Sequence, residues 1–247
     1  MKMTVKQNLH CLTNVLKNFL FPNFCALCGI NLYSSDDIFY GLCRNCRSFL
    51  NPETGKKCSI CGKPLFSEID LCLSCRKISN ENEPEIKTYD RLWKIYPYTG
   101  KYRKLLTSYK FKKNITLAAF FSEKIMEVIN INPELKEAVI VPVPPRPGKI
   151  KDIGWDQVNT IIKRLEKTKD IKVSRCLKRR KSKVQKILNR TERLENLKGR
   201  IYLNGQVPEK VLIIDDVITT GSTMEVCSQV LKEGGVKKVY GLCLFYD

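Results

Sequence analysis

Hydrophobic and polar positions alternate between two patterns over the last two thirds of the chain. Short, nearly continuous apolar runs predict buried strands, and they alternate with amphipathic segments that predict helices. The predicted strands are LWKIYPY (92–98), AVIVPVP (138–144), KVLIIDDV (210–217) and KKVYGLCLF (237–245), and the predicted helices are LAAFFSEKIMEVI (117–129), DQVNTIIKRLEK (156–167) and STMEVCSQVLKEGG (222–235). This order is typical of an α/β fold, a parallel sheet with helices on both faces.

The first 22 residues follow a third pattern. Leu9, Leu12, Leu16, Phe19 and Leu20 fall at helical spacing, so residues 1–22 are predicted to form a short amphipathic lead helix. Lysines interrupt its apolar positions, so it does not resemble a signal peptide. No apolar run is long enough to cross a bilayer. We therefore expect a cytoplasmic protein without a transmembrane segment, in which this helix packs on its own chain or contacts a membrane surface.

Between the lead helix and the α/β region, eight of the twelve cysteines form four C-x-x-C pairs. The stretch CALCG…LCRNCR is echoed by CSICG…LCLSCR, an internal repeat that predicts two zinc ribbons within residues 23–78. Two pairs complete a tetrahedral thiolate site with no open position, so both zinc ions are expected to be structural. The predicted ligands are Cys25, Cys28, Cys43 and Cys46 for one ion, and Cys58, Cys61, Cys72 and Cys75 for the other.

Two alternatives to this assignment remain open at the sequence level. A cross-braced arrangement joins the first pair with the third, and a redox role is the other known use of C-x-x-C. Glycine follows the first pair of each repeat (Gly29 and Gly62), where a positive φ lets backbone amides point at the sulfurs. The other cysteines, Cys11, Cys176, Cys227 and Cys243, are expected to be buried hydrophobic side chains.

The segment VLIIDDVITTGST (211–223) carries the most specific signal for a ligand. Two aspartates without a basic residue beside them follow four apolar residues, at the carboxyl end of a predicted central strand, where ligands of parallel sheets bind. Carboxylates accept hydrogen bonds from ribose hydroxyls, and a helix N-terminus preceded by small hydroxyl residues favours phosphate. We expect Asp215 and Asp216 to bind the ribose. The 5-phosphate would bind the loop formed by Thr219, Thr220, Gly221, Ser222 and Thr223.

This segment resembles the phosphoribosyl-diphosphate motif of type I phosphoribosyltransferases, and the whole chain resembles the ComF family of competence-associated proteins. Further matches are VPVP (141–144), GWDQV (154–158), and Arg180, Gln185, Leu188, Arg193 and Asn196. The resemblance implies a phosphoribosyltransferase-type domain at 86–247 behind the double zinc ribbon, with SNENEPEI (79–86) as the boundary. The chain departs from the family's Arg-Gly-Phe-Asn-Gln, because it has Ile153-Gly154-Trp155-Asp156-Gln157 at that place.

The enzyme hypothesis is phosphoribosyl transfer, the chemistry of the glycosyltransferase class. The resemblance implies binding of phosphoribosyl diphosphate with Mg²⁺, which prefers oxygen ligands. It also implies that the basic segment, residues 172–200, closes over the diphosphate. Arg179, Arg180 and Lys181 in this segment are the candidate diphosphate contacts. The sequence identifies neither the acceptor nor a general base.

The binding hypothesis is a module that handles single-stranded DNA, alone or with DNA-uptake proteins. The net charge is +19, with 44 Lys and Arg against 25 Asp and Glu, which favours anionic partners. GKYRKLLTSYKFKK (100–113) interleaves aromatic and basic residues, the combination that single-strand binding uses. Its candidate contacts are Lys110, Lys112 and Lys113, and the alternative is a helix whose aromatic residues face the core. The ComF family is associated with DNA uptake in natural transformation. A purely structural scaffold is the third hypothesis and leaves the aspartate–threonine loop unexplained.

Overall fold

The computed structural model describes residues 22–52, 55–65, 70–77, 87–148, 150, 154–168, 170–180, 197 and 199–247. Most of the predicted lead helix, the boundary segment and much of the basic segment lie outside these residues.

A parallel sheet forms the centre of the molecule. Its four strands are β3 (Arg91–Pro97), β8 (Lys238–Tyr246), β7 (Lys210–Ile218) and β4 (Val139–Pro142), in the order β3-β8-β7-β4. All three neighbouring pairs are parallel. On the outer side of β4, Ile140 forms a parallel bridge with Val173. The parallel sheet predicted from the apolar runs is confirmed.

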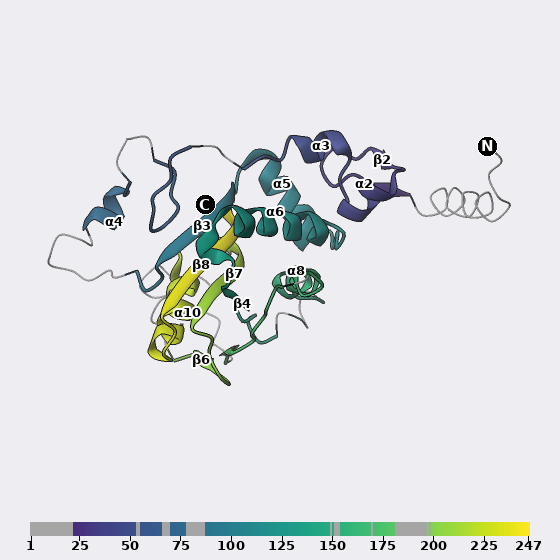
Figure 1. The fold of residues 1–247 in the computed structure, drawn as a ribbon. Helices are drawn as coiled ribbons and strands as arrows, with labels where there is room; N and C mark the ends of the chain where they lie inside the picture. Colours follow the sequence, from purple (N-terminus) through teal and green to yellow (C-terminus); the bar gives the residue numbers. More distant parts are fainter. Residues whose placement is uncertain are drawn as a thin grey trace.

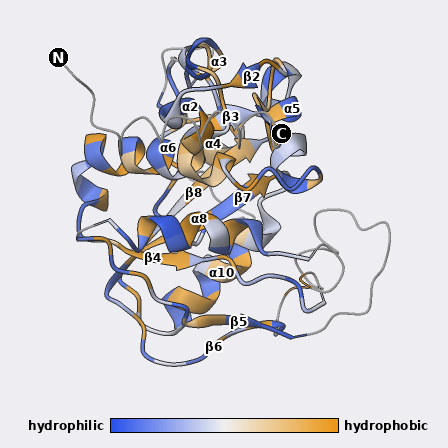
Figure 2. Ribbon diagram, turned by 90° about the vertical axis from the view of Figure 1, so that its right-hand side faces the viewer, coloured by the Kyte–Doolittle hydropathy of each residue, from blue (hydrophilic) through white to orange (hydrophobic). Residues whose placement is uncertain are grey.

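Helices cover both faces of the sheet (Figure 1). Helices α5 (Gly100–Lys110), α6 (Leu117–Ile131) and α8 (Gln157–Leu165) bury one face, and α10 (Ser222–Glu233) buries the other. The sequence of strand β7 is continuously apolar because both faces of the strand are buried. Leu212 and Ile214 belong to the core under α6 and α8, while Val211 and Ile213 belong to the core under α10. Each such side chain contributes about 1.5–3 kcal/mol to folding. In Figure 2 the hydrophobic colour accordingly concentrates on the strands and on the helix sides facing them.

The first cysteine repeat packs against α5 and α6. It contains β1 (Asn23–Phe24), β2 (Asn31–Leu32), α2 (Ser35–Tyr40) and α3 (Arg44–Ser48). Its buried leucines, Leu32, Leu42 and Leu50, belong to the same core as the two helices.

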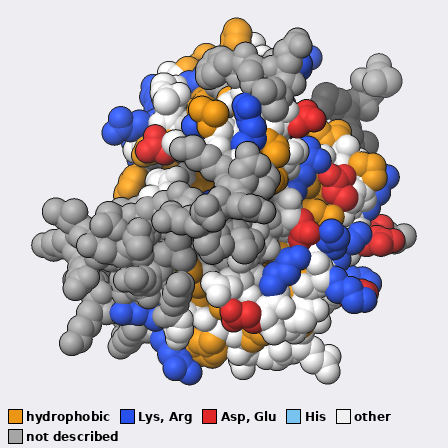
Figure 3. Space-filling model, turned by 90° about the vertical axis from the view of Figure 1, so that its left-hand side faces the viewer, with side chains coloured by type: hydrophobic (Ala, Val, Ile, Leu, Met, Phe, Trp, Pro, Cys, Tyr) orange, Lys and Arg blue, Asp and Glu red, His pale blue; other side chains and the backbone are white. Residues whose placement is uncertain are grey.

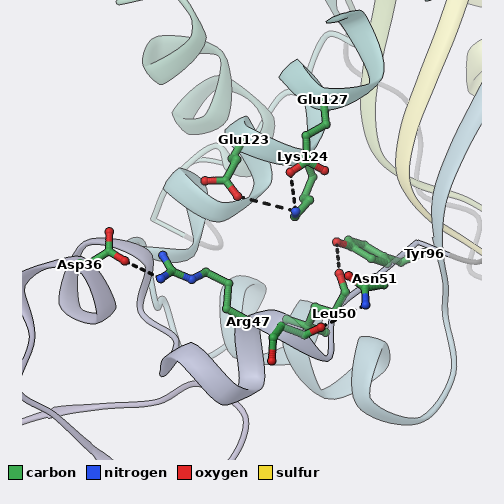
Figure 4. Close-up of polar contacts among 9 residues, drawn as sticks. Asp36, Arg47, Leu50, Asn51, Tyr96, Glu123, Lys124 and Glu127 are labelled. Atoms are coloured by element: carbon green, nitrogen blue, oxygen red, sulfur yellow. Dashed lines mark hydrogen bonds and ion pairs between the residues drawn. The ribbon is translucent and has the colours of Figure 1, made fainter. Parts of the chain in front are cut away.

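Polar contacts add to this interface (Figure 4). The Tyr96 hydroxyl donates to the Leu50 carbonyl at 2.9 Å. A hydrogen bond to Glu123 on α6 raises the pKa of Tyr40 to about 12, and burial adds to the shift. The first repeat is therefore joined to the α/β core by apolar and polar contacts together.

The second repeat contacts the core at β3. It includes α4 (Leu73–Lys77) and the turn after Cys58. The Leu92 N–H donates to the Ile60 carbonyl at 2.8 Å, and Lys57 Nζ donates to the Lys94 carbonyl at 3.1 Å. A Cβ at Gly62 would lie 2.4 Å from the Leu92 carbonyl oxygen, so only glycine allows this close approach.

Within the described part of the α/β region, three elements were not among those predicted from the sequence. A short 3₁₀ helix, η1 (Pro133–Leu135), follows α6. Strands β5 (Leu177–Arg179) and β6 (Ile201–Leu203) form an antiparallel pair at the two ends of the basic segment. The pair places Leu177 and Ile201 in the core beneath α10, so the start of the basic segment is anchored to the domain.

Candidate functional site

The eight paired cysteines form two four-sulfur clusters. One consists of Cys25, Cys28, Cys43 and Cys46, and the other of Cys58, Cys61, Cys72 and Cys75; within each, all four sulfurs lie within 4.8 Å of one another. The Sγ atoms of Cys28 and Cys43 are 3.7 Å apart, and those of Cys61 and Cys72 are 3.6 Å apart. A tetrahedral zinc–thiolate site with Zn–S bonds of about 2.3 Å requires sulfurs about 3.8 Å apart. Each cluster thus fits one zinc ion, and the cross-braced alternative is wrong.

The two clusters repeat the same local geometry. Burial raises the pKa of the Cys25 thiol, but hydrogen bonds from the N–H groups of Cys28, Cys43 and Leu27 bring it down to about 7. The pKa of Cys58 is raised by burial and brought down to about 7 by the equivalent N–H groups. Gly29 and Gly62 have the predicted positive φ, 76° and 66°, and the N–H of each donates to the carbonyl of the first cysteine of its repeat. Burial raises the pKa of Cys46 and Cys75, so Cys25 and Cys58 are the first of these thiols to lose a proton. Metal binding requires the ligand thiols to be deprotonated.

Three of the four other cysteines are buried, as expected. Cys176, Cys227 and Cys243 lie in the core beneath α10. Burial raises the pKa of the Cys227 and Cys243 thiols well above the ordinary value, which keeps them protonated and unreactive. Cys11 lies outside the described residues.

A cavity of about 470 Å³ opens at the carboxyl edge of the sheet. Its lining consists of Lys110, Phe111, Val143, Pro144, Pro145, Arg146, Asp156, Gln157, Val158, Arg179, Asp215 and Thr223. A second cavity of similar volume shares Arg146, Asp156 and Arg179 with it and extends toward Tyr202. The loop that follows β4, which contains the matched VPVP segment, thus lies between the ends of the strands and the start of α8.

The two adjacent aspartates differ in their surroundings. Strand β7 continues to Ile218, beyond the last residue that pairs with β4, so both side chains lie at an edge that β4 does not cover. Neighbouring strand residues point to opposite faces of a sheet. Asp215 lines the cavity and accepts the Asp216 N–H at 2.8 Å. Asp216 is buried on the other face.

The structure corrects the expectation that both carboxylates lack a basic partner. Lys110 Nζ, at the end of α5, lies 2.9 Å from Asp216 Oδ2, an ion pair without the angles of a hydrogen bond. Lys110, a predicted nucleic-acid contact, therefore belongs to this site. Local sequence does not indicate this pair, because only the tertiary fold brings the helix and the strand together.

Residues Thr219 to Gly221 join β7 to α10, and the other two residues of the predicted phosphate loop, Ser222 and Thr223, begin the helix. Gly221, with φ of 81°, is the N-cap of that helix, and the Thr220 and Ser222 hydroxyls lie 3.0 Å apart. The strand, loop and helix predicted from the sequence are confirmed. Thr223 reaches the cavity lining.

Positive charge gathers on the opposite wall of the cavity. Burial lowers the pKa of the Arg179 guanidinium, and the charges of Arg146 and Arg200 lower it further while Cys227 and Asp215 counteract them. Buried nitrogens of Arg179 and Arg200 have no hydrogen-bond partner among the residues described. An anion between these guanidinium groups would relieve both their repulsion and their unmet hydrogen bonds.

The other predicted anion contacts are placed differently. Arg180 is exposed, and its guanidinium lies over the Tyr202 ring, 4.8 Å from the centroid. Lys181 lies outside the described residues. On the face shown in Figure 3, basic side chains lie among acidic ones and form no single-sign patch in its described part.

The aromatic residues of the 100–113 segment serve mainly in packing. Tyr109 is buried, and its hydroxyl donates to the Gln157 carbonyl at 2.8 Å. The Tyr102 ring stacks on Tyr96 with centroids 4.8 Å apart. Phe111 is 72% exposed, and Lys112 and Lys113 beside it are exposed as well. The alternative of a helix with core-facing aromatics holds for the two tyrosines only.

Comparisons with known proteins agree with this organisation. Residues 16–76 match the family model of the double zinc ribbon domain. With the two sulfur clusters, this match supports two structural zinc sites. None of the helices among the described residues combines the length and the hydrophobicity of a membrane span.

The similarity to curated proteins extends over most of the chain. The competence protein ComFC of Streptococcus pneumoniae is 26% identical over 229 residues, which are 87% of this chain and 96% of that protein. Competence protein F of Haemophilus influenzae is 27% identical over 89% of this chain and 95% of its own length. ComFC of Bacillus subtilis is 26% identical over 78% of this chain and 79% of its own length. The resemblance to the ComF family is confirmed.

Solved structures were also matched over part of the chain. A hypoxanthine phosphoribosyltransferase from Staphylococcus aureus has 15% identity and a TM-score of 0.31, covering 51% of this chain and 65% of its own. A purine phosphoribosyltransferase from Pyrococcus horikoshii has 18% identity and a TM-score of 0.31, and the match covers 56% of this chain and 84% of that protein.

Proposed function

We propose, on the premise of this similarity to the ComF competence proteins, that the chain binds phosphoribosyl diphosphate with Mg²⁺ and acts in DNA uptake during natural transformation. The observation that carries the proposal is the cavity at the carboxyl edge of the sheet. It places a carboxylate (Asp215), a helix N-terminus (Thr223) and guanidinium groups (Arg146 and Arg179) around one space. These are the groups that a diol, a phosphate and a diphosphate require.

Each part of the ligand has a matching part of the site. The ribose hydroxyls donate to Asp215, the side chain of the aspartate pair that lines the cavity. The first turn of α10 offers backbone N–H groups and the positive end of its dipole to the 5-phosphate. The diphosphate lies toward Arg179, where a buried N–H lacks a partner among the described residues. The hydroxyl-rich loop supplies further donors from Thr219, Thr220 and Ser222.

Oxygen donors at this edge suit Mg²⁺, which favours carboxylate, phosphate and water ligands over nitrogen and sulfur. When bound, the ion neutralises charge on the diphosphate. Asp215 would hold the ion, because Asp216 is engaged by Lys110.

The reaction that this site would support is phosphoribosyl transfer. The bond between the ribose C1 and the diphosphate oxygen breaks, diphosphate leaves with the electron pair, and the acceptor's nucleophile forms the new bond to C1. Arg179 and Arg146 would stabilise the charge that develops on the leaving oxygens, because preorganised donors act most strongly where water is excluded.

Calorimetric titration with phosphoribosyl diphosphate in the presence of Mg²⁺ tests the proposal. We expect saturable binding of one molecule per chain, weakened when Mg²⁺ is replaced by a chelator. Absence of heat at millimolar ligand, with folded and zinc-loaded protein, would exclude the cavity as a site for this compound.

A module that binds single-stranded DNA is the second candidate function. The observation that favours it is the exposed Phe111 beside the exposed Lys112 and Lys113, at the mouth of the same cavity. An exposed ring offers a base a stacking surface among cations. The remaining lysine of the predicted set, Lys110, is held by Asp216.

This candidate predicts a specific change in salt dependence. Replacing Lys112 and Lys113 by Ala should reduce the slope of log affinity against log salt by roughly 0.7 per lysine, since each released counterion contributes that much for single strands. Phe111→Ala should weaken binding without changing the slope. The exposed Lys136, which directly follows η1, provides the control substitution. If the Lys112 and Lys113 substitutions leave the slope unchanged, these lysines do not contact DNA and are ordinary solvent-exposed side chains.

A further inference from the structure

Buried polar groups without partners concentrate around the candidate cavity. Among the described residues, both amide atoms of Gln157 and the Nε of Arg179 lack hydrogen bonds, and both residues line the cavity. A buried polar atom left unpaired destabilises the folded protein, so native structures keep few of them. Their presence at one cavity indicates that its ligand provides the missing partners.

Gln157 is the most buried of these groups. It is 1% exposed and is the first residue of α8. Asp156, the N-cap, accepts the Asn159 N–H at 3.1 Å, and the Tyr109 hydroxyl donates to the Gln157 carbonyl at 2.8 Å. The backbone of Gln157 is therefore fixed from two sides while its side chain borders the cavity. Helix capping and core packing account for the position of this residue, but they do not account for a buried amide.

The chemistry of the amide limits what the missing partner is. A glutamine side chain donates through Nε2 and accepts through Oε1. Phosphate oxygens only accept, so a phosphate group satisfies one of the two atoms. Neighbouring hydroxyls both donate and accept, so they satisfy the two atoms together. The carboxylate of Asp215, which lines the same cavity, is an acceptor for hydroxyl groups as well.

We infer that Gln157 binds the hydroxyl groups of the sugar in this cavity and so selects for a ribose-containing ligand over diphosphate alone. This inference rests on the proposed function and assigns one part of its ligand to a residue. GWDQV was noted only as a match in sequence; the inference gives its glutamine a role in ligand binding.

The substitution Gln157→Leu separates this role from a structural one. Leucine has a similar volume and no polar atoms, so the ligand-free variant should melt a few degrees higher, because two unpaired buried atoms are removed. In calorimetry with Mg²⁺, its affinity for phosphoribosyl diphosphate and for ribose 5-phosphate should fall about tenfold or more. Its affinity for inorganic diphosphate should stay within about twofold of wild type.

Ser228→Ala is the matched control. Ser228 is fully buried on α10, and its hydroxyl also lacks a partner among the described residues, but it does not line the cavity. This variant should keep wild-type affinity for all three ligands. Gln157→Asn keeps the amide and shortens its reach by one methylene, so it should fold normally and lose sugar affinity too.

The outcomes distinguish this inference from the proposal beneath it. If wild-type protein binds none of the three ligands, the proposed function and the inference are both wrong. If wild type binds and either Gln157 variant retains full affinity for ribose 5-phosphate, only the inference is wrong. A loss of diphosphate affinity with sugar affinity retained would likewise overturn the assignment to the hydroxyl groups.

Discussion

The double variant Asp215→Asn/Asp216→Asn is expected to show no measurable binding of phosphoribosyl diphosphate while remaining folded. Asparagine preserves size but replaces charged acceptors by neutral ones, and charge-assisted hydrogen bonds are roughly twice as strong. An amide has only one acceptor atom, so one charged bond of about 1.5–3 kcal/mol is lost and a second keeps about half its strength, which together correspond to a loss of about 10²–10³ in affinity. Titration calorimetry measures the affinity, and the thermal midpoint reports whether the fold is intact.

The single variants should separate the two carboxylates. Asp215→Asn should account for most of the lost affinity, because that side chain lines the cavity. Asp216→Asn should mainly lower the thermal midpoint, because it leaves the largely buried Lys110 without its ion-pair partner. The expected loss in the free energy of unfolding is about 1–3 kcal/mol, between the values measured for breaking solvent-exposed and fully buried ion pairs. From the sequence alone, removing the repulsion between the two adjacent aspartates would be expected to stabilise the empty protein. The loss of the Lys110–Asp216 ion pair offsets this gain in stability.

Thr220→Val is the control for the loop. Backbone N–H groups survive this change, so phosphate affinity should fall by no more than about tenfold. If the double Asn variant binds as tightly as wild type, the ligand site lies elsewhere and the enzyme hypothesis fails with it.

Loss of a cluster cysteine is the second large effect. Wild-type protein should carry two zinc ions per chain, and Cys58→Ala should carry one. Structural zinc in isolated fingers contributes about 10–16 kcal/mol near neutral pH, so the second repeat should unfold in this variant. Cys176→Ala removes an equally buried thiol outside the clusters and should keep both ions with a modest loss of stability. Elemental analysis and limited proteolysis measure the two outcomes.

A double substitution tests the pairing itself. Cys25→Ala/Cys46→Ala removes two ligands of one cluster, so one zinc ion per chain should remain. In a cross-braced arrangement the same two changes would fall on different sites and remove both ions. A zinc content near zero in this variant would contradict the clusters described above.

The parts of the fold that depend on local spacing could be predicted from the sequence. C-x-x-C pairs bring two sulfurs together within one turn, and a repeat of that spacing identifies the partner pair. Continuous apolar runs identify strands buried on both faces, such as 211–214. The strands β5 and β6 escaped prediction because each has only three residues, and they lie at the ends of a strongly basic segment.

The candidate site was only partly predictable from the sequence, because some of its residues lie in one local motif and others are brought in by tertiary packing. The motif at 211–223 identifies the carboxylates and the phosphate loop, because all of them lie within one strand, loop and helix. Lys110 and Gln157 line the cavity from α5 and α8. Their positions depend on how these two helices pack on the sheet, which the local sequence does not reveal. Asp156 and Gln157 within GWDQV were recognised as a match to a family, but their roles as N-cap and as buried amide depend on tertiary contacts.

The turn after Cys58 lies along an outer strand of the central sheet, and this has a consequence for the protein without metal. The Ile60 carbonyl accepts the Leu92 N–H of β3, which has β8 on its other side. Without the second zinc ion this turn would lose its shape and leave backbone groups of the edge strand β3 unpaired. Such edges template strand addition between chains. Zinc depletion should therefore cause aggregation through β3, because the folded second repeat covers the free edge of this strand.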